Sequence, residues 1–445
     1  MRWSFAELAA ELTDSEPGVD AGVEITGVSI DSRSVEPGDL FVPIIAERDG
    51  HEFVSLAIDR GAVAYLRMTA DPVDDRVPSL VVADTGDSLL RLGAAARDRL
   101  SGHVVGVTGS VGKTSVKDMI RSVCAEHFST HASAASFNNE LGVPLTLLGA
   151  PVDAGVVVIE MGARNVGHIE LLCRTARPTI GVVTAVAAVH TEIFGSIDHV
   201  AATKGELAEA LPPDGTLVLN ADDPLVAAMA GRSSTSRILT YGRSGADVTF
   251  TQIDVGADLH PTFTLSTPVG QARFTLGVAG AHMAQNAAAA AAVGCALGVD
   301  LDEIVAGLTA PAISPHRMDV QSTPTGAVII NDSYNANPTS MAAALDALCA
   351  VRADRRIAVL GVMAELGDSA ESDHLAVIEK AQAADIETIA VDAPLYGSAA
   401  AHVPDIASAV RLIGRLGHTD AVLVKGSRVA GLERVATALL DSGES

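Results

Sequence analysis

The feature that most constrains this chain is a glycine-rich loop between an apolar run and a helical pattern. The apolar run is Val104 to Val107, and it leads directly into Thr108-Gly109-Ser110-Val111-Gly112-Lys113-Thr114-Ser115. Strand, loop and helix in this order form a phosphate-binding loop, in which backbone N–H groups and a helix N-terminus face phosphate oxygens. We therefore expect an α/β fold with a mostly parallel sheet that binds a nucleoside triphosphate.

The side chains of the loop have separate expected roles. Lys113 is expected to hold the terminal phosphates, and Thr114 or Ser115 can bring a hydroxyl to Mg2+. The general spacing G-x-x-x-x-G-K-[ST] would place its first glycine at Val107, whereas this chain has Gly106. A glycine-rich turn that binds nothing is the alternative, and the order of strand, loop and helix argues against it.

Composition narrows the possible partners and the compartment. With 445 residues, 48% of them hydrophobic, the chain can form two or three domains with well-filled cores. Its net charge of -25 would repel nucleic acid and anionic membranes, and no apolar run reaches about 18 residues, so we expect neither partner and no membrane insertion. Four widely spaced cysteines and an acidic N-terminus without a signal peptide indicate a cytoplasmic protein with reduced thiols.

The order of apolar segments divides the chain into three predicted domains, the first of which, residues 1–98, mixes strand and helix signals. Residues 99–311 alternate strands with helices, which favours a mostly parallel sheet. The strands expected there are Val104 to Val107, Val156 to Ile159, Ile180 to Thr184 and Leu217 to Leu219. Residues 243–277 alternate polar and apolar side chains, so they predict antiparallel strands beside this sheet, and a long alanine-rich helix should follow His282.

The third predicted domain begins after a linker. Two prolines between Thr309 and Pro315 mark this linker, and residues 312–445 then repeat the strand and helix alternation. The strands expected there are Ala327 to Ile330, Ile357 to Leu360, Thr388 to Val391 and Ala421 to Val424. This pattern predicts a Rossmann-like C-terminal domain, although the G-x-G-x-x-G fingerprint is missing.

Polar residues after the expected strands are candidates for the nucleotide site. Glu160 directly follows the strand that ends at Ile159, and a carboxylate there suits Mg2+, although it can also cap the next turn. His190 follows the next strand across a loop of small residues, where a histidine is more often packed than a ligand. Lys204 lies at the start of an expected helix, a place where a lysine is ordinarily solvated.

Charged residues of the third domain can reach the nucleotide from the other side. Arg317 follows the linker, and Asp332 follows the strand that ends at Ile330. An arginine that reaches across from another domain can neutralise charge on a transferring phosphoryl group, which would make catalysis depend on domain closure. Lys425, Ser427 and Arg428 form another cationic turn, and each of these charges can also be surface charge.

Taken together, these motifs resemble the Mur ligases, ATP-dependent amide-forming enzymes of peptidoglycan precursor synthesis, and the resemblance covers nearly the whole chain. Its carriers are DSRSVEPGDLFVPI, RDGHEF, TGSVGKTS, SFNNELGVPLTLL, VIEMGARNVGHIELL, VHTEIFGS, ATKGEL, LNADDP, NDSYNANPTSM, AVLGVMAELGD and VLVKGSR. The phosphate loop with its glycine displaced by one residue is itself the form found in this family. Within the family, Asn335-Ala336-Asn337-Pro338 is most similar to the member that adds D-alanyl-D-alanine.

The resemblance implies three domains: one for the uridine nucleotide, a central ATPase and one that brings the incoming dipeptide. ATP would phosphorylate the terminal carboxylate of UDP-N-acetylmuramoyl-tripeptide, and the amine of D-alanyl-D-alanine would attack the acyl phosphate, releasing phosphate. ATP and Mg2+ are thus the implied cofactors, and we expect a monomer.

The resemblance also assigns roles to single residues. Lys113 would hold the phosphates, Thr114 and Glu160 would ligate Mg2+, and His190 would contact a second Mg2+. Lys204 matches a lysine that is carbamylated in this family, which requires the neutral amine. The other implied contacts are Asn138 and Asn139 near the reacting carboxylate, Asn286 at adenine, Arg317 at phosphate, Asp332 at the nucleotide, Ser32 and Arg33 at the uridine diphosphate, and Asn335, Asn337, Lys425, Ser427 and Arg428 at substrate.

Three positions differ from the family pattern: Ala185 stands where asparagine is usual, Met283 replaces the first Asn of H-N-x-x-N, and Val362 replaces an acidic residue. They affect the adenine contact and the choice of acceptor more than the reaction type. The alternatives are therefore a related ligase with another amine acceptor, of the MurE or folylpolyglutamate synthase type, or an inactive nucleotide-binding homologue. The absence of a D-N-P-R motif disfavours the MurE type.

Overall fold

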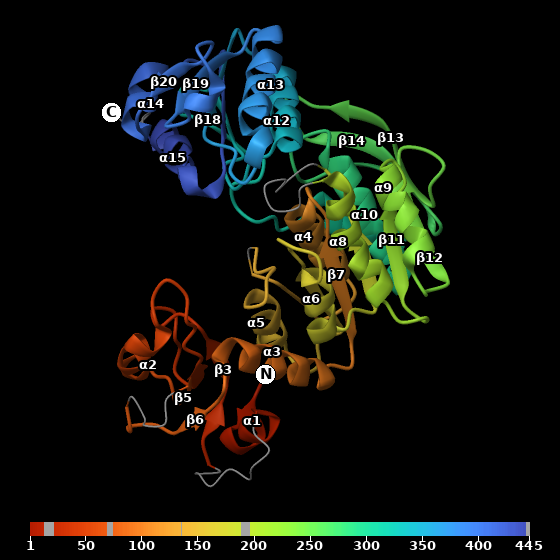
Figure 1. Cartoon of the computed structure of the whole chain (residues 1–445). Helices are drawn as coiled ribbons and strands as arrows, with labels where there is room; N and C mark the ends of the chain where they lie inside the picture. Colours follow the sequence, from red (N-terminus) through yellow and green to blue (C-terminus); the bar gives the residue numbers. More distant parts are fainter. Residues whose placement is uncertain (13–21, 69–73, 135, 188–195, 442–445) are drawn as a thin grey trace.

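The computed structural model describes residues 1–12, 22–68, 74–134, 136–187 and 196–441. Besides a two-stranded antiparallel sheet near the N-terminus, three larger sheets follow one another along the chain and lie in separate parts of the molecule (Figure 1). The first domain is drawn in red and orange, the central domain mostly in yellow and green, and the C-terminal domain in blue. The three-domain α/β architecture predicted from the sequence is therefore confirmed, whereas the limits at residues 98 and 311 stay predictions.

The first domain is built on a small parallel sheet with the order β3-β4-β5-β6. Its strands and helices are β1 (Trp3–Ser4), α1 (Phe5–Leu12), β2 (Glu24–Ile25), β3 (Gly27–Ser29), β4 (Asp39–Phe41), α2 (Val54–Asp59), β5 (Ala64–Arg67), β6 (Ser79–Val81) and α3 (Thr85–Asp98). The carboxylate of Asp84 caps α3 by accepting from the N–H of Asp87. Leu89 and Leu92 of α3 share one core with Val143 of the central domain, so this helix joins the two domains.

The central domain contains a nine-stranded sheet with the order β15-β14-β13-β12-β11-β10-β7-β9-β8. Its strands are β7 (His103–Thr108), β8 (Thr130–Ala132), β9 (Val156–Glu160), β10 (Ile180–Val183), β11 (Thr216–Asn220), β12 (Arg237–Gly242), β13 (Val248–Val255), β14 (Pro261–Thr267) and β15 (Gly270–Thr275). The ladder is parallel from β8 to β13, and β14 and β15 add antiparallel pairs, as the alternation after residue 243 predicted.

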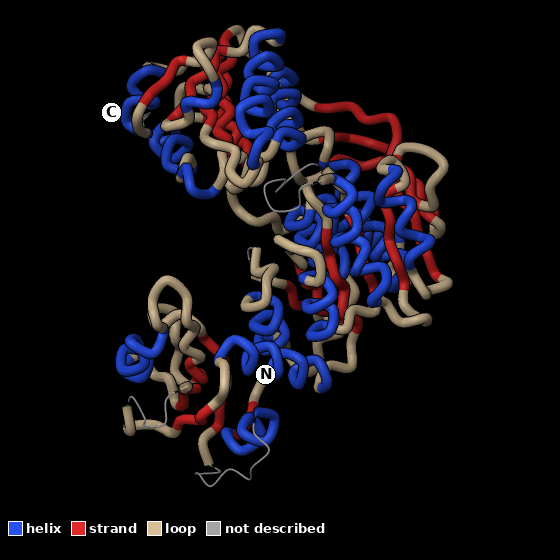
Figure 2. The backbone as a smooth tube through the Cα atoms, viewed as in Figure 1, coloured by secondary structure: helices blue, strands red, loops and turns tan. Residues whose placement is uncertain are grey.

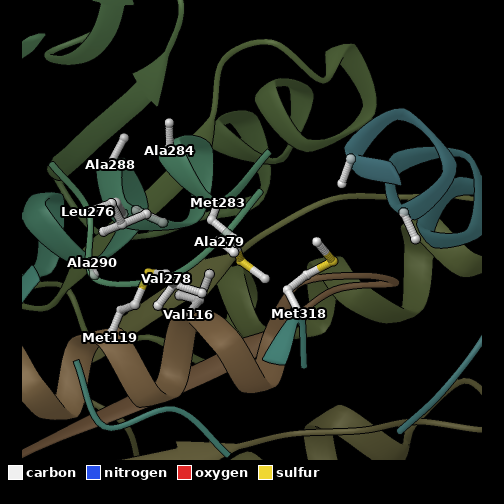
Figure 3. Packing of buried hydrophobic residues seen from close by; sticks show 14 of the residues in the cluster. Val116, Met119, Leu276, Val278, Ala279, Met283, Ala284, Ala288, Ala290 and Met318 are labelled. Carbon is white, nitrogen blue, oxygen red and sulfur yellow. The ribbon is translucent and has the colours of Figure 1, made fainter. Parts of the chain in front are cut away.

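Helices cover both faces of this sheet (Figure 2). The described ones are α4 (Lys113–Ala125), α5 (Gly142–Gly149), α6 (His168–Ala176), α8 (Ile197–Ala210), α9 (Pro224–Ala227), α10 (Met283–Leu297) and α11 (Leu301–Thr309). The alanine-rich helix α10 is buried against α4 and the strands β11 to β14, and Figure 3 shows Ala284, Ala288 and Ala290 in this layer. Small side chains there let the helices approach closely, since bulkier ones would overfill the interior.

The C-terminal domain has a six-stranded sheet with the order β16-β17-β21-β18-β19-β20. Its elements are β16 (Asp319–Ser322), β17 (Val328–Asn331), α12 (Pro338–Ala350), β18 (Arg355–Leu360), α13 (Ala370–Ala383), β19 (Glu387–Val391), β20 (Ala401–Val403), α14 (Ile406–Ile413), β21 (Asp420–Lys425) and α15 (Glu433–Asp441). All pairs are parallel except that of β16 with β17. Short 3-10 turns complete the chain, and no helix in the described ranges is both long and apolar enough to cross a bilayer.

Candidate active site

A cavity of about 410 Å³ lies where the phosphate loop meets the C-terminal domain. The carboxyl ends of β7, β9 and β10 meet there, because Val107 is opposite Glu160 and Thr108 is opposite Val183. Ligands of open α/β sheets bind at this edge. The predicted residues that line the cavity are Gly109, Ser110, Val111, Gly112, Lys113, Thr114, Ser115, Asn138, Asn139, Glu160, Lys204, Asn286, Arg317, Asp332, Asn335, Asn337 and Lys425.

The phosphate loop owes its shape to two glycines. Gly109 and Gly112 have φ values of 143° and 84°, which side chains rarely allow, and Gly112 precedes the first turn of α4. A Cβ on Gly109 would lie 2.0 Å from the hydroxyl oxygen of Thr184. This hydroxyl donates to the carbonyl of Val111 at 2.5 Å, and the N–H of Ser110 donates to the carbonyl of Ala185 at 2.7 Å. The loop is therefore held from the end of β10.

Lys113 folds back over the loop that it follows. Its Nζ donates to the carbonyl oxygens of Gly109, at 2.7 Å, and Ser110, at 3.3 Å. Burial lowers the pKa of Lys113, nearby Glu160 opposes this shift, and Arg317 adds to it. The ammonium thus lies where an anion that enters the loop would gain most from it.

A chain of hydrogen bonds joins four of the predicted residues in front of the loop. The hydroxyl of Thr114 donates to Oε2 of the buried Glu160 at 2.8 Å, and Nδ2 of Asn138 donates to Oε1 at 2.8 Å. Arg317 donates from Nη2 to the Thr114 hydroxyl at 2.9 Å. Hydroxyl and carboxylate oxygens are the ligands that Mg2+ prefers, so the pair of Thr114 and Glu160 fits this ion.

Arg317 is also held by an aromatic ring. Its guanidinium carbon lies 4.3 Å from the ring centroid of Tyr334, and the Tyr334 hydroxyl contacts the hydroxyl of Ser136 in the central domain. Nε of Arg317 is buried and has no hydrogen-bond partner in the described part of the chain. A phosphate oxygen in the cavity would satisfy a donor of this kind.

Asp332 and Lys425 form a buried ion pair in the wall of the C-terminal domain. Their charged atoms are 2.5 Å apart, and the ammonium also donates to the carbonyl of Asn335 at 2.9 Å. The other oxygen of Asp332 accepts from the N–H of Met318 at 3.1 Å. Because Met318 follows the linker, this pair connects the linker to the C-terminal sheet.

Lys204 is buried, contrary to the ordinary expectation for a lysine in a helix. Only 3% of it is exposed, and it points into the cavity from α8. Burial lowers its pKa to about 7, the charge of Lys113 acts in the same direction, and Glu206 opposes it. Near neutral pH a large share of Lys204 is therefore the uncharged amine that carbamylation needs.

The structure does not bring every predicted residue to the cavity. His190 lies outside the described residues. The Thr108 hydroxyl donates to the carbonyl of Met161 at 2.8 Å. Ser427 is buried, and its hydroxyl accepts from the N–H of Ala364. Arg428 is exposed, 5.9 Å from the Tyr334 ring. Ser32 and Arg33 belong to the first domain and do not line the cavity, and Arg33 pairs with Asp31 and holds the pKa of that carboxyl at about 2.

The three departures from the pattern lie in different surroundings. Ala185 and Met283 line the cavity, and the sulfur of Met283 accepts a contact from Nδ2 of Asn286 at 3.3 Å. Val362 is not among the lining residues, and its carbonyl accepts from the N–H of Ser427. Only the first two changes alter the cavity wall directly.

Several lining residues were not among the sequence candidates. They are Ser136, Glu140, Arg164, His168, Gln285, Tyr334, Thr339, Ser340 and Glu365. Arg164 and His168 follow β9, and Tyr334 follows β17, so the rule that found Glu160 could also have found them. Glu365 follows β18 in the same way, within the motif AVLGVMAELGD, and has a φ of 64°.

Comparison with known families agrees with this geometry. Residues 24–95 match the catalytic domain of the Mur ligase family, 107–294 its middle domain and 316–428 its glutamate ligase domain. The chain is 36% identical to the UDP-N-acetylmuramoyl-tripeptide--D-alanyl-D-alanine ligase of Escherichia coli strain K12, over 98% of both chains. The chain belongs to the Mur ligase family.

Solved Mur ligase structures share the whole architecture. A crystal structure of MurF from Acinetobacter baumannii has a TM-score of 0.88 and 29% identity, and the match covers 99% of both chains. A MurF ligase from Thermotoga maritima in complex with ADP has a TM-score of 0.81 and 26% identity, over 94% of this chain and 98% of the other. The likeness thus extends over all three domains of this Mur ligase.

Proposed function

We propose that this Mur ligase joins D-alanyl-D-alanine to UDP-N-acetylmuramoyl-tripeptide at the expense of ATP. The observation that carries the proposal is 36% identity, over 98% of this chain, to a ligase of that name. In addition, Lys113, Glu160, Lys204 and Arg317 line one cavity. An inactive homologue has no need to keep these four side chains together. A different amine acceptor is the remaining alternative within the family.

The reaction proceeds in two steps. A terminal carboxylate oxygen of the tripeptide attacks the γ-phosphorus of ATP, the bond to ADP breaks, and an acyl phosphate forms. The amine of D-alanyl-D-alanine then attacks the acyl carbon, loses a proton, and phosphate leaves as the amide forms. The products are ADP, phosphate and the UDP-linked pentapeptide. The tripeptide carboxylate is a poor electrophile, and the acyl phosphate activates it by supplying phosphate as the leaving group.

The side chains of the cavity serve the first step. Lys113 and Arg317 place positive charge on both sides of the transferred phosphoryl group, whose oxygens carry the negative charge. Thr114 and Glu160 would hold Mg2+, which screens the charge of the ATP phosphates. Asn138 keeps the Glu160 carboxylate oriented through its hydrogen bond.

Lys204 completes the site as a carbamate. Its neutral amine attacks CO2 and loses a proton, which converts the uncharged amine into an anion with two oxygens. The lowered pKa of about 7 supports this step, because only the uncharged amine has a free lone pair. By family resemblance this oxygen pair and His190 would serve a second Mg2+.

The domains divide the substrates between them. We assign residues 1–98, with Ser32 and Arg33, to the uridine diphosphate, residues 99–311 to ATP, and residues 312–445 to the dipeptide. Asn139, Asn286, Asn335, Asn337, Asp332 and Lys425 are the further contacts that we assign within the cavity. Since ATP and a UDP-linked precursor are the substrates, we place the reaction in the cytoplasm.

The proposal is tested by measuring phosphate release from ATP with Mg2+ and UDP-N-acetylmuramoyl-tripeptide. Separate reactions contain D-alanyl-D-alanine, a single diamino acid, glutamate or no acceptor. Release that requires the dipeptide, together with a pentapeptide product by mass spectrometry, supports the proposed activity. Release with a single amino acid would favour the alternative acceptors, and no release with any acceptor would contradict ligase activity.

A further inference from the structure

The linker between the central and C-terminal domains runs along one face of α4. Thr114, Asp118 and Ser122 are spaced by four residues, so they project from the same side of this helix. Each of them binds a different part of the linker. The three hydrogen bonds are Arg317 Nη2 to Thr114 Oγ1 at 2.9 Å, the Ser314 N–H to Asp118 Oδ2 at 2.8 Å, and the Ala312 N–H to Ser122 Oγ at 3.0 Å.

Two of these acceptors, Asp118 and Ser122, are also held by contacts within the central domain. Asp118 is 3% exposed, and its second oxygen lies 2.9 Å from Nζ of the buried Lys117. The Ser122 hydroxyl donates to the carbonyl of Asp118 at 3.0 Å, which turns its lone pairs outward. Lys117 also donates to the carbonyl of Ser133, whose hydroxyl accepts from the N–H of Glu160. The acceptors therefore belong to the same buried network as the nucleotide site.

Beyond Ser314 the linker is held by the C-terminal domain instead. The carbonyl of His316 accepts from the N–H of Tyr334 at 3.2 Å, and the N–H of Met318 donates to Asp332. His316 and Met318 have φ values of 62° and 51°, a region that side chains rarely adopt unless their surroundings hold them. Arg317 lies between these two residues, so its backbone direction is strongly restricted.

The other face of α4 packs into the core. Figure 3 shows Val116 and Met119 of this helix beside Val278, and it also shows the side chain of Met318 in the same cluster. The helix therefore cannot move together with the linker without disturbing the core, so it gives the linker a fixed position.

We propose that Asp118 and Ser122 are positioning residues for the ligase reaction. They bind the linker backbone, at Ser314 and Ala312, to the phosphate-loop helix and so keep the Arg317 guanidinium within reach of Thr114 at the loop. Pro315 lies between Ser314, whose N–H bonds α4, and His316, whose carbonyl bonds the C-terminal domain, and beyond it the Arg317 side chain bonds Thr114 of α4. Asp118, Ser122, Ala312 and Ser314 form what we call the linker tether, which does not depend on the proposed function. The effect of this tether on the reaction rests on the proposed function.

The tether is tested first by hydrogen exchange of the full-length protein, read by mass spectrometry on peptides that cover residues 311–316. Pro311 and Pro315 have no N–H, so few amides contribute to this signal. Ser122→Ala combined with Asp118→Asn should raise exchange at Ala312 and Ser314 about tenfold, with no change in peptides from β7. Ser122→Thr, which keeps the hydroxyl, should exchange like the unmodified chain. Unchanged exchange in the double variant would overturn the proposal.

Turnover then tests the positioning role. The double variant should lower kcat about five- to twentyfold and leave the KM for ATP within about twofold, because the loop itself is intact. Its effect should be strongly non-additive with Arg317→Ala, since both changes act through the same guanidinium. Ser372→Ala is the matched control, because this α13 hydroxyl donates to Ser369 and touches no part of the linker.

The outcomes remain separable. If Asp118→Asn removes the carboxylate that pairs with Lys117 and prevents folding, Ser122→Ala alone carries both measurements, with Ser122→Thr as its rescue. Additive effects of the tether and Arg317 changes would overturn the positioning role. If the unmodified chain has no ligase activity but the double variant still exchanges faster at Ala312 and Ser314, the tether is supported and the proposed function is contradicted.

Discussion

At the scale of single residues, the environment decides what a side chain can do. Lys204 and Lys380 are both lysines of helices, yet Lys204 is buried beside Lys113, whereas Lys380 forms an ion pair with Asp346 at 2.6 Å on the surface. Burial lowers the pKa of Lys204 to about 7. The same residue type thus supplies a reactive amine in one place and a solvated charge in the other.

Replacement of Lys204 should therefore remove activity without unfolding the protein. We expect Lys204→Ala to reduce ligase turnover by at least about a hundredfold, because the proposed carbamate oxygens are lost. The circular dichroism spectrum and the melting temperature should change little, since a buried amine is replaced by a smaller apolar group. Lys380→Ala is the control and should leave turnover unchanged. Normal turnover in Lys204→Ala would contradict the carbamate proposal.

A second residue-scale prediction concerns pH and His374 in α13. This buried imidazole accepts from the N–H of Met363 at 3.0 Å and contacts the carbonyl of Ala370 at 2.6 Å, and burial lowers its pKa below 6.5. Below pH 6.5 the unfolded chain takes up a proton that the folded protein resists, so the unfolding free energy should fall as pH falls.

The measurement is urea unfolding between pH 7.5 and 5, followed by circular dichroism. His374→Gln should flatten the slope by at most one proton, which is about 1.4 kcal/mol per pH unit. An unchanged slope in His374→Gln would exclude this histidine as the titrating group.

At the scale of elements, α4 combines three tasks. Its first turn carries the phosphate loop residues, one face packs into the core, and another holds the linker. Close packing against α11 makes this possible. A Cβ on Gly307 of α11 would lie 2.6 Å from the Cα of Val123, so only glycine fits at the crossing.

Gly307→Ala should therefore destabilise the central domain by about 1–3 kcal/mol, because the added methyl group meets backbone atoms that cannot move aside. The change is read as a lower urea midpoint at unchanged slope. Gly231→Ala is the matched control, since no atom lies within 4 Å of the position that its Cβ would take, and it should shift stability by less than about 0.5 kcal/mol. Equal effects of the two changes would contradict the close crossing.

At the scale of the whole molecule, the three domains contribute unequally to the lining of the cavity. Arg317 and Asp332 already line the cavity with the phosphate loop, whereas Ser32 and Arg33 lie in the first domain and do not. The closure predicted from the sequence must therefore come mainly from approach of the first domain.

Addition of ATP, Mg2+ and UDP-N-acetylmuramoyl-tripeptide should make the molecule more compact. We expect a smaller radius of gyration by small-angle X-ray scattering, because the tripeptide substrate has to connect the first domain to the cavity. ATP alone should give a smaller change. The same dimensions with all ligands present would contradict closure.

Much of the fold could be predicted from the sequence, because the patterns involved are local. The apolar runs that gave β7, β9, β10 and β11 need only alternation with helices to predict a parallel sheet. The phosphate loop needs glycines at fixed spacing, and Glu160 needs only its place directly after a strand. Family motifs added the remaining candidates, whose roles stay predictions.

Other features were decided by tertiary structure. The surroundings of Lys204 and Glu365, the contact of Arg317 with Thr114, and the direction of the linker join segments far apart in the chain. Sequence by itself determined which residues form strands, loops and helices, since these depend on neighbours along the chain. Only the fold decided which charges are buried and which share a cavity, because burial and Coulomb interaction depend on distances in space.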